Sequence, residues 1–172
     1  LGGIGKGYAL DRAAALLQSN GIRDILLHAG FSTIMATGNA PSNPGMGWPV
    51  GIRHPLKPDQ DFAILRLMDS ALATSGSGEQ GFVIDGERFG HIIDPRTGYP
   101  ARGRLLSSAV APTGALADAL STAFFVMDTQ EIQAYCNSHQ GIGALMVRRE
   151  QGQEKNLSIE TLGSLQNKVQ LV

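Results

Sequence analysis

The residues best suited to chemistry lie in one stretch, residues 90–100, which reads GHIIDPRTGYP. Side chains of four different chemistries follow one another there: His91, Asp94, Arg96 and Thr97. Ile92 and Ile93 indicate the buried end of a strand, which ends before Pro95 because a residue preceding proline is pushed out of the α region. Polar groups at a strand end can be aimed at a ligand, so the stretch predicts a ligand-facing rim.

A second group of polar residues lies in a mostly apolar segment, residues 115–127, that predicts a helix. Asp118 and Thr122 stand four residues apart, so both project from one face. Two explanations are open: Thr122 returns its hydroxyl to the carbonyl of residue 118, or the two side chains offer hard oxygen ligands to a divalent cation. The local explanation suffices for Thr122 alone. It is weaker for Asp118, because a carboxylate is seldom buried without a partner.

A glycine-rich segment, LGGIGKG at residues 1–7, opens the chain and leads into an amphipathic helical pattern that Gly21 closes. The start of a helix exposes backbone amides that favour anions. The alternative is that these glycines only let the chain turn. The segment therefore indicates either an anion site or a simple turn.

The elements that must position these residues follow from the rest of the pattern. Strands are predicted over residues 24–30, 33–38, 48–52, 105–111 and 143–147, and a further helix over 131–138. Residues 62–72 begin as a strand, 73–79 indicate a tight polar turn, and 148–156 a polar loop. Asp85-Gly86 is a strong hairpin signal, and the return strand of that hairpin leads to His91.

Composition limits the classes of function. A chain of 172 residues with 42% hydrophobic composition can bury one core, and its net charge of -1 gives no electrostatic footprint for nucleic acid. The single Cys136 excludes an internal disulfide and a multi-cysteine metal site. His28 and His54 have no acidic or thiol neighbours in sequence and are interpreted as structural or surface residues. The chain opens without methionine, which indicates an internal start.

Three segments together resemble one family in order and spacing. They are LGGIGKGYA at 1–9, ATSG at 73–76 with HIIDPRTG at 91–98, and ADALSTA at 117–123. The pattern is similar to the ApbE family of FAD:protein FMN transferases and covers essentially the whole chain. The resemblance implies an α+β fold of the T-fold-like type, with a mostly antiparallel sheet packed with helices. It also implies that residues 1–172 are one such domain, the C-terminal portion, lacking its N-terminal segment.

The activity implied by the resemblance is magnesium-dependent transfer of FMN from FAD to a threonine hydroxyl of a partner flavoprotein, with release of AMP. His91 would be the base, since an imidazole titrates near neutral pH. The resemblance assigns Mg²⁺ to the Asp118 and Thr122 side chains and a main-chain carbonyl at Gly3. It assigns contacts with FAD to Gly3, Lys6, Ser75, Gly76, Ile92 and Thr97. For Asp94 and Arg96 a structural ion pair at the turn is the favoured interpretation.

The family pattern also implies a location and alternatives. The expected location is periplasmic at the inner membrane, with membrane association through a lipid anchor on the missing N-terminal segment. Residues 28–31 read HAGF where the family usually has Asn-x-Gly-Gly, and Gly78 stands where a Tyr-Glu pair is usual. These departures leave open a flavin carrier without transferase activity. A third hypothesis, implied by the family, is a metal-dependent hydrolase that uses the same site with water as acceptor and converts FAD to FMN and AMP.

Overall fold

The computed structural model describes residues 2–77, 81–84, 87–150 and 153–172. In these ranges the helices are α1 (Gly5–Ser19), α2 (Gly114–Val126) and α3 (Thr129–Ser138). The strands are β1 (Ile25–Ala29), β2 (Thr33–Thr37), β3 (Trp48–His54), β4 (Lys57–Leu67), β5 (Ser70–Gly76), β6 (Gly81–Ile84), β7 (Glu87–Gly90), β8 (Leu106–Ala111), β9 (Gly143–Glu150), β10 (Gln153–Gly163) and β11 (Gln170–Leu171).

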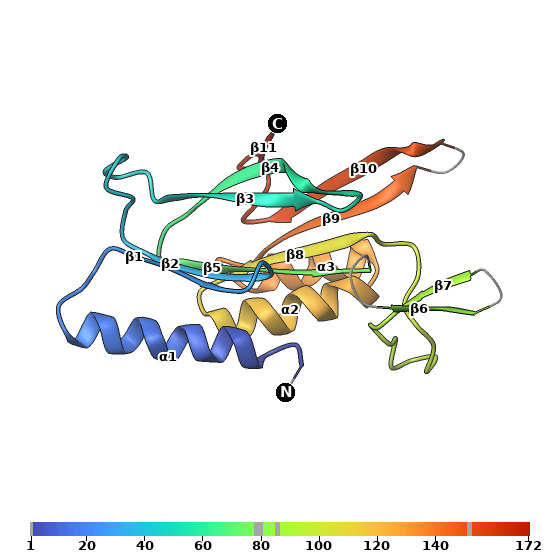
Figure 1. The fold of residues 1–172 in the computed structure, drawn as a ribbon, viewed down its shortest axis with the longest axis horizontal. Helices are drawn as coiled ribbons and strands as arrows, with labels where there is room; N and C mark the ends of the chain where they lie inside the picture. The colour runs from blue at the N-terminus through green and yellow to red at the C-terminus, as the bar shows by residue number, and fades with distance from the viewer. Residues whose placement is uncertain (1, 78–80, 85–86, 151–152) are drawn as a thin grey trace.

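The described strands form sheets, and the helices cover one side of the largest of them (Figure 1). The largest sheet has the order β1-β2-β5-β8-β9-β10, a smaller sheet has the order β11-β4-β3, and β6 pairs with β7. Figure 1 shows the helices below the large sheet and the β3–β4 pair above it. Every pairing between these strands is antiparallel. The prediction of an α+β fold with a mostly antiparallel sheet is confirmed.

Apolar layers fill both sides of the six-stranded sheet. Between the two larger sheets lie aliphatic side chains such as Leu65 and Leu145. On the helix side the sheet presents small residues, among them Ala73 and Ala109, against Phe124 of α2. Burying a Leu or Phe side chain contributes about 1.5–3 kcal/mol. Because the sheet surface under α2 is built from small side chains, the helix lies close enough for its polar groups to meet those of β5.

Helices α1 and α2 cross at a pair of glycines. A Cβ added to Gly7 would collide with the backbone carbonyl of Gly114, so the two helix backbones touch directly. Beside the crossing, the Asp11 carboxylate accepts hydrogen bonds from the backbone N–H groups of Gly114 at 2.6 Å and Ala115 at 2.9 Å. A negative charge at a helix N-terminus is stabilising. The start of α2 is therefore fixed by α1.

Gly7→Ala should destabilise the fold by about 3 kcal/mol, because the added methyl group meets backbone atoms that cannot move aside. Chemical denaturation monitored by circular dichroism measures this effect. Gly2→Ala is the matched control, since a Cβ at Gly2 has no atom within 4 Å. Equal stability of the two variants would show that the helices do not cross at Gly7.

Several elements predicted from the sequence are confirmed. The helix over 115–127 is α2, and the strand over 105–111 is β8. The predicted hairpin exists as the antiparallel pair β6 and β7, although its Asp85-Gly86 turn lies outside the described residues. Cys136 is buried among the apolar residues under the helices, and burial raises the pKa of its thiol. His28 is exposed on β1, and the His54 ring accepts a 3.0 Å hydrogen bond from the N–H of Leu56.

Three sequence predictions are wrong. Residues 73–76 belong to strand β5 and not to a turn, because β2 and β8 pair with them from both sides. Ile93 is 50% exposed and joins Pro100 only through an isolated bridge, because the chain leaves the sheet after β7. The predicted loop over 148–156 is shorter than expected. β9 extends to Glu150 and β10 begins at Gln153, since an antiparallel strand tolerates exposed polar residues.

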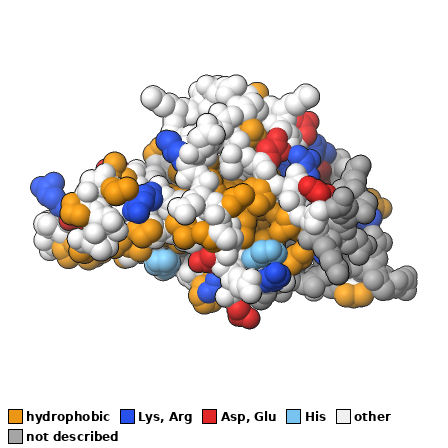
Figure 2. Space-filling model, turned by 90° about the horizontal axis from the view of Figure 1, so that it is seen from above, with side chains coloured by type: hydrophobic (Ala, Val, Ile, Leu, Met, Phe, Trp, Pro, Cys, Tyr) orange, Lys and Arg blue, Asp and Glu red, His pale blue; other side chains and the backbone are white. Residues whose placement is uncertain are grey.

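The surface carries charges of both signs. On the face shown in Figure 2, Lys and Arg side chains are interspersed with Asp and Glu around a central group of hydrophobic side chains. In the part of the chain that the structure describes, no helix is long and apolar enough to cross a membrane.

Candidate functional site

Asp118 lies at the point where the N-terminus of α1, the start of β2 and the middle of α2 meet. Its side chain is 5% exposed. One carboxylate oxygen, Oδ2, accepts a hydrogen bond from the N–H of Gly7 at 3.1 Å, and Oδ1 accepts a longer one from the Thr33 hydroxyl at 3.4 Å. A carboxylate offers about four lone-pair sites, so each oxygen keeps capacity for another partner. These two hydrogen bonds orient the Asp118 carboxylate, and both of its oxygens can still accept a further hydrogen bond or bind a metal ion.

A cluster of hydroxyl groups continues from Asp118 along α2. The Ser75 hydroxyl, at the end of β5, lies 2.9 Å from the Ser121 hydroxyl and 3.2 Å from the Thr122 hydroxyl. The Thr122 hydroxyl reaches the carbonyl of Asp118 only at 3.5 Å, a weak contact. A local bond therefore does not account fully for Thr122, and its oxygen is available to a further partner.

The glycine segment that precedes α1 completes this cluster. Gly3 has φ of +75°, and a Cβ added to it would lie 3.4 Å from the Thr122 hydroxyl. The structure thus brings together four of the predicted residues: Gly3, Ser75, Asp118 and Thr122. We refer to these four as the oxygen cluster. Gly76 follows Ser75 at the end of β5.

The oxygen cluster fits a small hard cation. The cluster holds one carboxylate and two hydroxyls, and the backbone of Gly3 lies beside the Thr122 hydroxyl. Mg²⁺ is commonly held by one or two carboxylates together with water and substrate phosphates. Over the described ranges, no group of three or more His, Cys, Asp or Glu side chains forms a metal site. The oxygen cluster has a single carboxylate, so it is not a metal site of the type in which three or more His, Cys, Asp or Glu side chains bind the ion.

Two neighbours of Asp118 were not singled out from the sequence. Thr33 donates to its carboxylate across 85 positions of the chain, and no sequence signal identifies that partner. Ser121 donates to the carbonyl of Asp118 at 2.9 Å, and its position next to Thr122 in the ADALSTA segment could have indicated it. Lys6, which precedes Gly7, donates from Nζ to the Ser32 hydroxyl at 2.6 Å.

The 90–100 segment leaves β7 and folds as a turn beside the C-terminal end of α2. His91 is exposed and Ile92 is buried. The Thr97 hydroxyl accepts a hydrogen bond from the N–H of Tyr99 at 3.2 Å within the turn. Within the described ranges, neither Asp118 nor Thr122 forms a hydrogen bond with Ile92 or Thr97.

Arg96 ties the 90–100 segment to α2. Its Nη2 donates to Asp94 at 2.9 Å and to the carbonyl of Val126 at 2.5 Å, and its Nε donates to Asp94 at 3.0 Å. The structural ion pair predicted for Asp94 and Arg96 is present. Arg104 also donates to carbonyls at this helix end, those of Phe124 and Met127. Two guanidinium groups therefore stabilise the negative end of α2.

Electrostatics reinforce this link. Hydrogen bonds from the side chain and backbone of Arg96 lower the pKa of the Asp94 carboxyl, and the same pairing raises the pKa of Arg96. Because the folded-state pKa of Asp94 lies below its unfolded value, the pair stabilises the fold above the unfolded pKa. That contribution is lost as the pH falls through the folded pKa. At neutral pH the ion pair between Asp94 and Arg96 is therefore fully formed.

Comparison with known proteins places this geometry in a family. The model of the ApbE family matches residues 1–146. A FAD:protein FMN transferase of Rhodobacter capsulatus is 42% identical over 131 residues, covering 76% of this chain and 24% of that protein. One of Salmonella typhimurium is 33% identical over 151 residues, covering 86% of this chain and 41% of that protein.

Solved structures agree with this assignment. The crystal structure of the ApbE protein from Thermotoga maritima matches with a TM-score of 0.80 and 34% identity, covering 96% of this chain and 52% of that one. The flavin transferase ApbE from Vibrio cholerae matches with a TM-score of 0.77 and 28% identity, over 96% of this chain and 50% of that one. The chain thus spans from about a quarter to a half of the relatives it matches. It belongs to the ApbE family.

Proposed function

We propose that the protein carrying this chain transfers FMN from FAD to a threonine hydroxyl of a partner flavoprotein, in a magnesium-dependent reaction that releases AMP. The observation that carries the proposal is the oxygen cluster, in which Gly3, Ser75, Asp118 and Thr122 converge from three separate parts of the chain. Membership in a family whose relatives are named FAD:protein FMN transferases supports it.

In this proposal the carboxylate of Asp118, the hydroxyl of Thr122 and the carbonyl of Gly3 hold Mg²⁺. The ion supplies neutralisation of charge on the diphosphate of FAD. These three residues suit the ion because carboxylate, hydroxyl and carbonyl oxygens are the hard ligands that Mg²⁺ prefers. The residues along FAD are Gly3, Lys6, Ser75, Gly76, Ile92 and Thr97. Lys6 adds a positive charge at the start of α1, where backbone amides also favour phosphate.

His91 acts as the general base. Its imidazole accepts the proton of the threonine hydroxyl, and the threonine oxygen forms a bond to the phosphorus of the FMN half. The bond from that phosphorus to the bridging oxygen breaks, and AMP leaves with the bridging oxygen. The proton on His91 then passes to the departing phosphate or to solvent. An exposed position suits this role, because the base must meet a hydroxyl carried by another protein.

The experiment that tests the proposal mixes the intact protein with FAD, Mg²⁺ and a threonine-bearing acceptor. Flavin fluorescence that stays on the acceptor band in a denaturing gel supports transfer. Free FMN in equal amount to AMP, with an unlabelled acceptor, supports hydrolysis with water in place of the threonine. FAD that remains bound and unchanged supports a carrier. Either of the last two results refutes the proposed transfer.

The family resemblance also supports a proposal about location. We infer that the protein works on the periplasmic face of the inner membrane, held through an N-terminal lipid anchor. Cell fractionation with a periplasmic marker tests this. Recovery of the protein with cytoplasmic markers would contradict it.

Arg96→Ala should lower the turnover number for transfer roughly 10- to 100-fold while leaving the KM for FAD nearly unchanged. The Arg96 guanidinium joins the 90–100 segment to the carbonyl of Val126 at the end of α2. Without this bond, the position of His91 relative to Asp118 on α2 is no longer fixed. Steady-state kinetics measure both constants. Arg66→Ala is the control, since Arg66 is an exposed arginine on β4 in the smaller sheet, and the helices cover the opposite side of the large sheet. Equal effects of the two variants would contradict a positioning role.

A further inference from the structure

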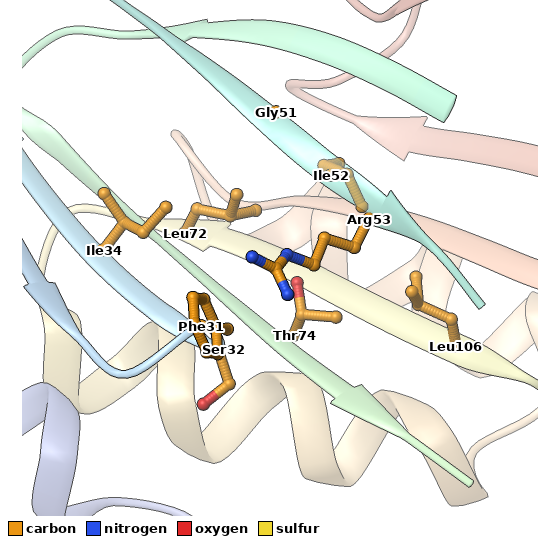
Figure 3. Close-up of a pocket in the computed structure, with 9 residues that line it drawn as sticks. All are labelled: Phe31, Ser32, Ile34, Gly51, Ile52, Arg53, Leu72, Thr74 and Leu106. Atoms are coloured by element: carbon orange, nitrogen blue, oxygen red, sulfur yellow. The ribbon is translucent and has the colours of Figure 1, made fainter. Parts of the chain in front are cut away.

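Strand β5 directs the hydroxyls of Thr74 and Ser75 to opposite sides of the six-stranded sheet. Figure 3 shows Thr74 on the side that faces β3, together with Leu106 of the neighbouring strand β8. Because side chains alternate along a strand, Ser75 and Ser107 lie on the other side, beneath α2. On the β3 side, Thr74 bonds across to Ser108, its register partner, with the two oxygens 2.8 Å apart. The helix side of the same two strands is arranged differently.

Ser75 and Ser107 are also register partners. Ser107 is fully buried, yet its hydroxyl forms no hydrogen bond with any residue that the structure describes. The Ser75 hydroxyl turns instead to α2, where it lies 2.9 Å from the Ser121 oxygen and 3.2 Å from the Thr122 oxygen. Ser121 is buried as well, with 1% of its surface exposed. Three hydroxyls, those of Ser75, Ser121 and Thr122, thus form a row between strand and helix, which we call the hydroxyl row.

The hydrogen atoms of the hydroxyl row can be assigned by counting donors. Each hydroxyl donates one hydrogen. The Ser121 hydroxyl donates to the carbonyl of Asp118 at 2.9 Å. Since that hydrogen is then used, Ser75 donates to Ser121, and Thr122 in turn donates to Ser75. The hydrogen bonds therefore all point one way, from Thr122 toward the Asp118 carbonyl.

The other acceptor within reach of the Thr122 hydroxyl is that same carbonyl, and both of its lone pairs are already used. Asp118 lies inside α2, where a carbonyl accepts the N–H group four residues further on. The Ser121 hydroxyl takes the second lone pair, and the Thr122 hydroxyl reaches the carbonyl only at 3.5 Å. Thr122 therefore donates to Ser75, and within the described ranges nothing donates to its own oxygen. That oxygen borders Gly3, where an added Cβ would lie 3.4 Å from it.

A hydroxyl binds a cation through a lone pair of its oxygen, and a hydrogen bond received by that oxygen competes for the lone pair. We propose that Ser121 is a positioning residue, which orders the hydroxyl row so that Thr122 meets the cation of the oxygen cluster only as an electron-pair donor. Replacing a residue that orients a metal ligand commonly weakens metal binding roughly 10- to 100-fold. The inference rests on the proposed function, since it takes Thr122 as a metal ligand.

Ser121→Ala should raise the dissociation constant for Mn²⁺ roughly 10-fold in the intact protein with FAD bound, and leave the melting temperature unchanged. Without Ser121, the Ser75 hydrogen turns to the Thr122 oxygen and competes with the ion for a lone pair. Electron paramagnetic resonance of the unbound Mn²⁺ measures this affinity without turnover. In steady-state transfer, the Mg²⁺ concentration for half-maximal rate should rise by a similar factor, whereas the turnover number at saturating Mg²⁺ should stay the same.

Ser107→Ala is the matched control. Ser107 is equally buried and lies opposite Ser75 in the register, but it takes no part in the hydroxyl row, so its loss should leave Mn²⁺ affinity unchanged. A double variant separates ordering from packing. Ser75→Ala removes the hydroxyl that competes for Thr122, so adding Ser121→Ala in that background should cause no further loss of Mn²⁺ affinity.

Parent Mn²⁺ affinity in Ser121→Ala, or an equal loss in Ser107→Ala, would overturn the ordering role. An additive loss in the double variant would overturn it as well, since Ser121 would then act on the ion without Ser75. Asp118→Asn tells the two proposals apart. If Asp118→Asn weakens Mn²⁺ binding and Ser121→Ala does not, only the ordering role fails. If Ser121→Ala weakens Mn²⁺ binding in a protein that transfers no FMN, only the transfer fails.

Discussion

Asp118→Asn should lower magnesium-dependent FMN transfer roughly 100- to 1,000-fold. The substitution removes the one carboxylate of the oxygen cluster but keeps the shape of the side chain. An amide oxygen still accepts the hydrogen bond that Gly7 donates at 3.1 Å, so the crossing of α1 and α2 is retained. Initial rates measured against Mg²⁺ concentration should show a large rise in the concentration needed for half-maximal activity.

A second substitution at the same position separates metal binding from folding. Asp118→Ala also leaves the Gly7 N–H without its acceptor in a buried place, which costs about 1–3 kcal/mol of stability. Asp11→Asn is the matched control. Asp11 also joins α1 to α2, but its carboxylate accepts hydrogen bonds from the N–H groups of Gly114 and Ala115 at the N-terminus of α2. Asp11→Asn should change stability and leave the Mg²⁺ titration in place. A magnesium titration of Asp118→Asn that matches the parent protein would exclude Asp118 as a ligand.

His91→Gln should reduce transfer roughly 100- to 10,000-fold and leave FAD affinity unchanged. His91 is exposed, so its loss creates no cavity, and glutamine keeps a polar group of similar reach without a titrating base. Single-turnover transfer and equilibrium FAD titration measure the two quantities. His28→Gln, an exposed histidine on β1, is the control. Transfer at the parent rate in His91→Gln would show that another group removes the hydroxyl proton.

The helix that carries the candidate ligands could be predicted because its signal is local. Asp118 and Thr122 are four residues apart in an apolar segment, and helical periodicity alone puts them on one face. The glycines before α1 and the 90–100 segment also have distinctive compositions. The roles of the glycines and of the 90–100 segment are predicted only by the family resemblance. The helix over 115–127 and its polar face are predicted by helical periodicity.

The partners of these residues could not be predicted, because they depend on contacts between distant parts of the chain. Gly7 meets Asp118 across 111 positions, and Arg96 meets Val126 across 30. The same reason explains the error over residues 73–76. Serine, threonine and glycine favour turns in isolation, but pairing with β2 and β8 holds these residues extended in β5. That extended conformation is what points Ser75 at Thr122.

The contact between Phe31 and Arg53 shows the same limit. Nothing in the spacing of these two residues indicates a contact, since one follows β1 and the other lies near the end of β3. They meet only because the smaller sheet packs over the larger one and brings β3 above the start of β2.

The most direct test of the central claim is the intact mass of the acceptor protein after incubation with the intact protein, FAD and Mg²⁺. We expect an added mass of one FMN less one water on a threonine, with one AMP released for each acceptor modified. Chelation of Mg²⁺ should prevent both. An acceptor of unchanged mass, in a reaction where FAD is bound and Mg²⁺ is present, would contradict the transfer of FMN to a threonine.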